Sequence, residues 1–170
     1  MDESNRRSVI AAEGLAFCSL KNLIRWGDHL KLDQPNIDTQ HERIFKLALE
    51  ACELSREPEN FIKLKSVFDA FGEVLKAHFR YEETKLTEIH YPKLEEHRAQ
   101  HEAMLSELEF VAQRLENKGV GWAFQQQPLV ILNFMIGVTV GHILQSDADY
   151  ARYMQEVGAR ESWHYDNPIR

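Results

Sequence analysis

The chain has 170 residues, of which 44% are hydrophobic and 28% are charged, a balance typical of one soluble domain with a full core. Lys and Arg total 20 against 27 Asp and Glu, and this acidic balance without a basic cluster argues against nucleic-acid binding. Cys18 and Cys52 form no CxxC pair, which favours a reducing compartment and predicts a cytoplasmic location. The longest apolar run, residues 129–144, is short for a membrane span of about 20 residues, so we expect no membrane insertion.

The N-terminal part of the chain divides into an extension and an arm. Apolar residues spaced three and four apart over residues 8–24 predict a short amphipathic helix within an extension of residues 1–25. Residues 26–36 contain Gly27 and Pro35 and are expected to form an extended arm. The next helix is predicted to begin near Asp38, a candidate N-cap.

Prolines and glycines delimit the other helices. We predict one helix from Pro58 to about Glu88, another from Pro92 to Gly119, and a last one from Pro128 onward. Each carries an apolar stripe at helical spacing, and no β-type alternation is present. The pattern therefore predicts an all-α, antiparallel up-down-up-down four-helix bundle over residues 26–158, with an N-terminal helical extension (1–25) and a C-terminal tail (159–170).

Chemically active side chains lie on the inner faces of these helices. The set comprises five histidines and two acids: His41, His78, Glu82, His97, His101, His142 and Asp147. A lone histidine on an apolar stripe is usually a hydrogen-bonded core residue, but seven such groups without a cation would leave many polar atoms unsatisfied. Imidazole with carboxylate favours iron, and the absence of thiolates disfavours a structural zinc site. The pattern therefore predicts a metal centre.

The number of donor atoms indicates two metals. Five imidazole nitrogens, two bridging carboxylates and a bridging oxide or hydroxide fill all but one position of two octahedral ions, which leaves a place for a small ligand. Asp147 fits this set poorly, because five residues correspond to about 140° around an ideal α-helix and Ser146 is better aligned with His142. As a ligand, Asp147 would require a locally widened helix or a side chain that reaches round from the flank.

Four motifs make a family resemblance specific: Gln40-His41, His78-x3-Glu82, His97-x3-His101 and His142-x4-Asp147. Together they resemble the ligand signature of the hemerythrin family, in particular its bacterial branch, the bacteriohemerythrins, over roughly residues 26–153. The resemblance implies a non-haem diiron centre with a bridging oxide or hydroxide, which binds O2 reversibly as hydroperoxide. It assigns His97, His101 and His142 to a coordinatively full iron, His41 and His78 to the iron with the open position, and Glu82 and Asp147 to the bridges.

The resemblance also suggests the walls of an O2 pocket. Ile44, Phe79 and Ile143 would supply apolar surface beside the open position. Val138 stands where the family commonly has a Trp, so we expect an opened site and faster autoxidation, which Val138→Trp or Thr139→Leu should slow. The Thr139 hydroxyl would either bond a bound ligand or bond a carbonyl of its own helix, and both alternatives stay open at this point.

Three roles follow from the resemblance. The first two are an O2 carrier or store and an O2 sensor; the alternative is a diiron redox enzyme or sensor acting on peroxide or nitric oxide. A histidine-rich set is less anionic than that of carboxylate-rich diiron enzymes and favours binding over substrate oxidation, so we expect no enzyme activity. Expected partners are O2 and, through the extension or the tail, a second copy or a signalling protein. Gly137 and Gly141 are two small residues four apart on the outer side of the last helix and permit a second element to pack closely there. We expect residues 8–24 to fold back onto this side, and another subunit is the alternative.

Overall fold

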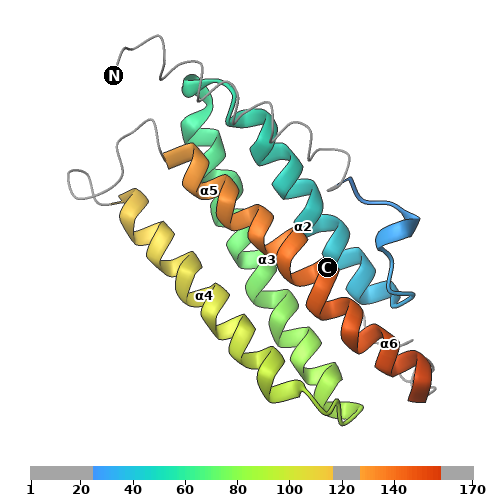
Figure 1. The fold of residues 1–170 in the computed structure, drawn as a ribbon. Coiled ribbons are helices and arrows are strands. Elements are labelled where there is room, and N and C mark those ends of the chain that lie inside the picture. Colours follow the sequence, from blue (N-terminus) through green and yellow to red (C-terminus); the bar gives the residue numbers. More distant parts are fainter. Residues whose placement is uncertain (1–24, 117–126, 158–170) are drawn as a thin grey trace, which may run out of the picture.

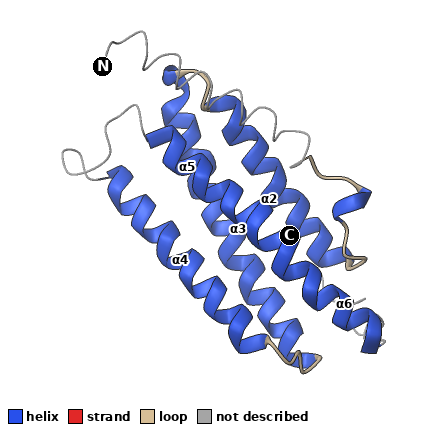
Figure 2. Ribbon diagram, in the orientation of Figure 1, coloured by secondary structure: helices blue, strands red, loops and turns tan. Residues whose placement is uncertain are grey.

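The computed structural model describes residues 25–116 and 127–157, which form a bundle of antiparallel helical rods (Figure 1). The first three rods are α2 (Pro35–Leu54), α3 (Phe61–Glu88) and α4 (Leu94–Glu116). The fourth rod is continuous but has three parts: α5 (Gln127–Ile136), the π-helical segment η4 (Gly137–Asp147) and α6 (Ala148–Val157). Short 3-10 turns, η1 (Asp28–Leu30) and η2 (Pro58–Asn60), precede α2 and α3. The described ranges contain no strand, and the all-α four-helix bundle is confirmed (Figure 2).

The beginning of α2 differs from the prediction. The helix begins at Pro35 rather than near Asp38, because proline has a fixed φ suited to the first helical position. Asp38 therefore lies in the first turn and is not the N-cap. Its carboxylate instead accepts hydrogen bonds from the backbone N–H groups of Leu32 (2.7 Å) and Gln34 (3.1 Å). These bonds fix the arm that leads into the helix.

The core consists of two apolar clusters with a polar layer between them. The larger cluster includes Ile44 on α2 and Phe79 on α3, and the smaller one includes Ile37 on α2 and Leu86 on α3. Along α2, His41 lies in sequence between Ile37 and Ile44, and along α3 both predicted ligands lie between Leu75 of the larger cluster and Leu86 of the smaller one. The packing on either side therefore fixes the helical faces that carry the ligands.

The widened segment η4 accounts for the spacing of His142 and Asp147. In a π-helix each N–H bonds the carbonyl five residues earlier, so side chains five residues apart come onto the same face. Both residues lie within η4 and both are buried, whereas Ser146 between them is half-buried. Of the two explanations that the sequence allowed, the structure shows local widening of the helix.

The fourth rod is apolar along most of its length. By length and composition Gln127–Gln155 could cross a membrane, which is weak evidence because the core helix of a soluble bundle passes the same test. Its α5 part contacts α2, α3 and α4. On its outer side, a Cβ added at Gly137 or Gly141 would meet nothing within 4 Å. Residues 1–24, which include the predicted helix over residues 8–24, and the predicted tail lie outside the described residues, so the packing of residues 8–24 on this side stays a prediction.

Candidate metal centre

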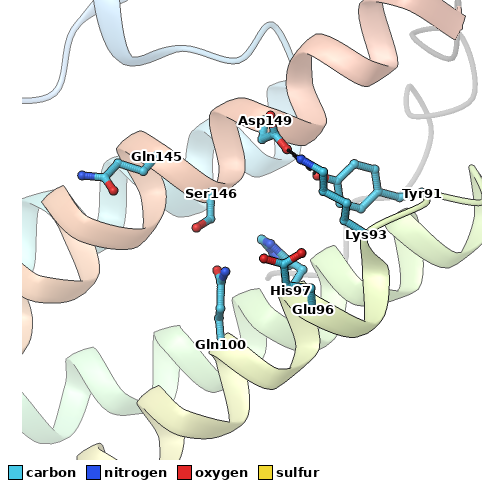
Figure 3. Close-up of a pocket in the computed structure, with 8 residues that line it drawn as sticks. All are labelled: Tyr91, Lys93, Glu96, His97, Gln100, Gln145, Ser146 and Asp149. Carbon is cyan, nitrogen blue, oxygen red and sulfur yellow. Dashed lines mark hydrogen bonds and ion pairs between the residues drawn. The ribbon is translucent and has the colours of Figure 1, made fainter.

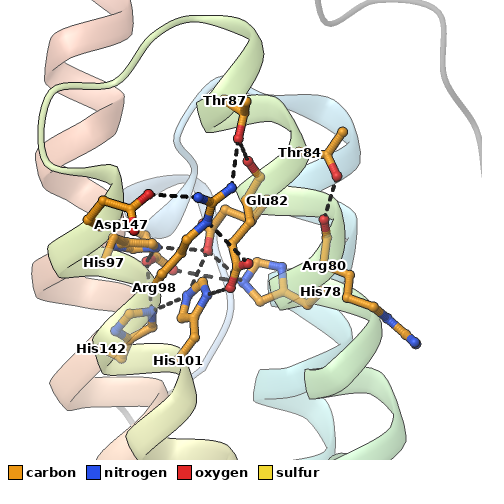
Figure 4. A network of polar contacts seen from close by, with 12 residues as sticks. His78, Arg80, Glu82, Thr84, Thr87, His97, Arg98, His101, His142 and Asp147 are labelled. Carbon is orange, nitrogen blue, oxygen red and sulfur yellow. Dashed lines mark hydrogen bonds and ion pairs between the residues drawn. The ribbon is translucent and has the colours of Figure 1, made fainter.

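All seven predicted ligand residues converge in the polar layer, and Figure 4 shows six of them reaching inward from α3, α4 and the fourth rod. Their ligand atoms form two groups, each with all atoms within 4.8 Å of one another. One group contains Glu82, His97, His101 and His142, and the other contains His41, His78, Glu82 and Asp147. Because Glu82 belongs to both, the groups are two halves of one site.

Asp147 lies between the two halves. Its Oδ2 is 3.2 Å from His41 Nε2 and 3.9 Å from His78 Nε2. Its Oδ1 is 3.2 Å from His142 Nε2 and 3.6 Å from His97 Nε2. One carboxylate oxygen thus faces each half, which is the arrangement of a bridging ligand.

Glu82 is directed mainly toward the half with three histidines. Its Oε2 is 3.0 Å from His97 Nε2, 3.1 Å from His101 Nε2 and 3.8 Å from His78 Nε2. Its Oε1 is buried and has no hydrogen-bond partner. The same carboxylate therefore has one oxygen among the histidines and one still available as a ligand.

Burial and charge in this layer fit a bound cation. Burial lowers the pKa of His78 to about 4 and that of His142 to about 3, which keeps both imidazoles in the neutral, ligating form at pH 7. Burial and the nearby Glu82 carboxylate raise the pKa of Asp147 well above its ordinary value. Burial also opposes ionisation of Glu82, but His78, His101 and His97 outweigh it and hold its pKa low. Because a cation would favour both ionised carboxylates and neutral imidazoles, the donor set fits a metal.

Comparison with known proteins identifies a cation-binding domain family. The family model of the hemerythrin HHE cation binding domain matches residues 33–154. The chain belongs to the hemerythrin family. A relative in this family, a bacteriohemerythrin of Clostridium acetobutylicum, is 25% identical over 128 residues, which cover 74% of this chain and 96% of the relative. No solved structure gave a significant match.

Two side chains next to the predicted hemerythrin ligands orient the imidazoles. His78 donates a hydrogen bond from Nδ1 to Gln40 Oε1 (3.0 Å), and His101 donates from Nδ1 to Glu83 Oε1 (2.7 Å). Each bond leaves the Nε2 lone pair directed into the site. Sequence reasoning gave neither residue this role. A signal was present, since each residue directly adjoins a predicted ligand in the chain.

Loss of the Gln40 contact should weaken one half of the centre. In Gln40→Leu the His78 ring loses its Nδ1 partner, so we expect metal affinity to fall by roughly 10- to 100-fold, the usual effect of removing such a partner. Gln34 is a matched control because it is equally buried (2% exposed against 4%) and none of its hydrogen bonds reaches a predicted ligand. Competition titration with a chelator measures both variants. Equal affinity in Gln40→Leu and Gln34→Leu would show that Gln40 does not orient His78.

Two aromatic residues pack against the predicted ligands from outside the set. Trp26 from the arm lies edge-on to His41, with ring centroids 6.1 Å apart, and the sequence had placed it only in an extended segment. Tyr150 on α6 lies edge-on to His97, at 5.8 Å, and is fully buried. Burial and the neighbouring Glu82 and Asp147 carboxylates raise the pKa of Tyr150 well above its ordinary value, so it stays protonated. Both rings therefore pack directly against predicted ligands.

The residues predicted to line an O2 pocket are all buried. Ile44, Phe79, Val138 and Ile143 belong to the larger apolar cluster. Phe79 is stacked on His101, with centroids 3.7 Å apart and an interplanar angle of 7°. The Thr139 hydroxyl donates to the carbonyl of Met135 (3.0 Å), one turn earlier in the same rod. Its single proton is therefore already used within the helix.

Removal of the Thr139 hydroxyl should accordingly matter little. Thr139→Val keeps the side-chain shape and loses a hydrogen bond that is satisfied locally, so we expect the lifetime of the oxygenated form to change by less than about twofold. The lifetime is followed optically after the reduced, iron-loaded protein is mixed with O2. Thr139→Leu, which changes the volume at the same position, is the comparison. A much shorter lifetime in Thr139→Val alone would mean that the hydroxyl turns toward the ligand.

Proposed function

We propose that this chain holds two iron ions in the polar layer and binds O2 reversibly at one of them, as an O2 carrier, store or sensor. The proposal rests on the division of the buried ligand atoms into two groups that share Glu82, with the oxygens of Asp147 directed one toward each half. Membership of the hemerythrin family supports the choice of iron. When bound, the irons supply the electrons that reversible O2 binding requires.

We assign the seven predicted ligands to the two irons as follows. His97, His101 and His142 hold one iron, His41 and His78 hold the other, and Glu82 and Asp147 bridge them together with an oxide or hydroxide. The half with two histidines has one nitrogen fewer, which supports placing the open position there. Ile44, Phe79, Val138, Thr139 and Ile143 form the wall of the O2 pocket, and the buried apolar side chains among them exclude water.

An optical spectrum tests this proposal most directly. The reduced, iron-loaded protein is measured without O2, after addition of O2, and again after O2 is removed. Reversible binding predicts a visible charge-transfer band that appears with O2 and disappears on deoxygenation. Irreversible conversion to a diferric form would favour the alternative, a diiron redox enzyme or a sensor acting on peroxide or nitric oxide.

The proposal includes a cytoplasmic location and no catalytic turnover. The observation behind the second part is the ligand set, in which five imidazoles accompany only two carboxylates. A carrier and a sensor differ in their partners: a sensor requires a second copy or a signalling protein whose binding depends on iron oxidation state. Analytical ultracentrifugation of the reduced and oxidised forms distinguishes self-association of this kind.

A further inference from the structure

A metal ion cannot reach the polar layer without passing between helices. The most exposed of the seven predicted ligands are His142 (5%) and His97 (3%), and four of the seven are completely buried. His97 lines a pocket between α4 and the fourth rod, which indicates one side from which the layer can be approached. The inference below rests on the proposed diiron centre.

A pocket of about 300 Å³ lies on this side, between α4 and the junction of η4 with α6 (Figure 3). Glu96 is exposed at its rim, Gln100 is half-buried one turn further along α4, and the buried His97 lies between them. The pocket therefore leads from solvent to a predicted iron ligand. At about 30 Å³ per water it has room for roughly ten waters, enough for a hydrated divalent ion.

The lining of the pocket is polar and suits a cation better than O2. None of the five residues predicted to line the O2 pocket contributes to it. Among the charged side chains that line the pocket, Lys93 Nζ lies 2.6 Å from Asp149 Oδ2, so these two charges offset each other. The Glu96 carboxylate at the rim then supplies the negative charge of the pocket. The Gln100 Oε1 atom is buried and has no hydrogen-bond partner. Carboxylate and amide oxygens are ligands that a hard divalent ion accepts in exchange for its waters.

We propose that this pocket is the path by which ferrous iron enters the centre. Glu96 attracts the hydrated ion, the Gln100 carbonyl oxygen replaces part of its water shell, and His97 is the first permanent ligand that it meets. O2 needs no such path, because a small apolar molecule gains nothing from charged and amide groups. Iron and O2 would thus reach the centre through different surfaces.

The rate of iron uptake tests this path. The metal-free protein is mixed anaerobically with a ferrous salt, and the iron left in solution is trapped at intervals with a colorimetric chelator. Glu96→Gln should slow uptake roughly tenfold at low ionic strength, the lower end of the effect of a focused field, and the difference should shrink in high salt. Gln100→Leu should slow uptake at all salt concentrations. Both variants should reach the wild-type iron content in the end.

Glu95→Gln is the matched control. Glu95 adjoins Glu96 in the chain and is strongly exposed (84%), but it pairs with Arg98 and does not line the pocket. Its loss changes the net charge equally, so wild-type uptake in this variant assigns the effect to the pocket. Wild-type rates in both Glu96→Gln and Gln100→Leu would overturn the path and leave the proposed function intact. A wild-type chain that takes up no iron would overturn both proposals.

Discussion

Replacing Glu82 with alanine is expected to empty the whole metal centre, whereas replacing His78 should empty only one half. Glu82 belongs to both groups of ligand atoms, so in the proposed diiron centre Glu82→Ala would remove an oxygen ligand from each iron. We expect the affinity for iron to fall by more than about 100-fold in both halves of the centre. Loss of a residue that only hydrogen-bonds a metal ligand already lowers metal affinity about 10- to 100-fold. His78→Ala leaves His97, His101, His142 and both carboxylates in place, so one iron should remain.

Iron content per chain and the spectrum of the loaded protein measure this difference. Glu73→Ala is the control on the same helix, because Glu73 is strongly exposed (77%) and its carboxylate pairs with the neighbouring Lys76. Glu82→Gln, which keeps the shape of the side chain, separates loss of a ligand from loss of packing. Full iron occupancy in Glu82→Ala would show that this carboxylate does not join the two halves.

Exchanging the side chains of residues 146 and 147 is expected to break the second bridge. In the variant Ser146→Asp/Asp147→Ser the carboxylate moves to the position four residues after His142, which would be correct in an ordinary α-helix. In the π-helical segment that position faces the pocket beside α4, so the carboxylate would point away from His41 (Figure 3). We expect iron in the half with two histidines to be lost, with affinity reduced by at least about 10- to 100-fold.

The single variant Ser146→Asn controls for a larger polar group at this position while Asp147 stays in place, and its final iron content should be that of the wild type. Iron content and the visible spectrum of the exchanged variant give the result. A fully loaded exchanged variant with a normal spectrum would show that the segment returns to α-helical spacing when the ligand moves.

The helical faces of the site could be predicted from the sequence because they depend on periodicity alone. His78 and Glu82, like His97 and His101, are four residues apart on apolar stripes, and the structure brings both pairs into the polar layer. The bundle followed from the same stripes and from prolines near the helix ends. Asp147 was different: periodicity pointed to Ser146, and only the resemblance to a family selected the residue that lies between the two halves.

Features that depend on contacts between different helices were outside the reach of periodicity. Gln40 orients His78 from the neighbouring helix, and Glu83 orients His101 in the same way. The beginning of α2 at Pro35 was missed because Asp38 resembles an N-cap in sequence, while its carboxylate in fact holds the preceding arm. Each case requires knowing which backbone or side chain lies opposite, and the spacing of residues along one helix does not give that information.

If the proposed diiron centre forms, the polar layer between the two apolar clusters would also make folding depend on iron supply. Without metal, buried atoms such as Glu82 Oε1 and both Asp147 carboxylate oxygens have no hydrogen-bond partner, which weakens the folded state. A metal that binds only the folded chain returns this free energy, and each tenfold rise in free iron above the dissociation constant adds about 1.4 kcal/mol for each iron bound. The melting temperature of the protein should therefore rise with the logarithm of available iron. In a cell, copies made during iron shortage would be the first to unfold and be degraded, so the abundance of the protein would follow the metal supply without a separate regulator.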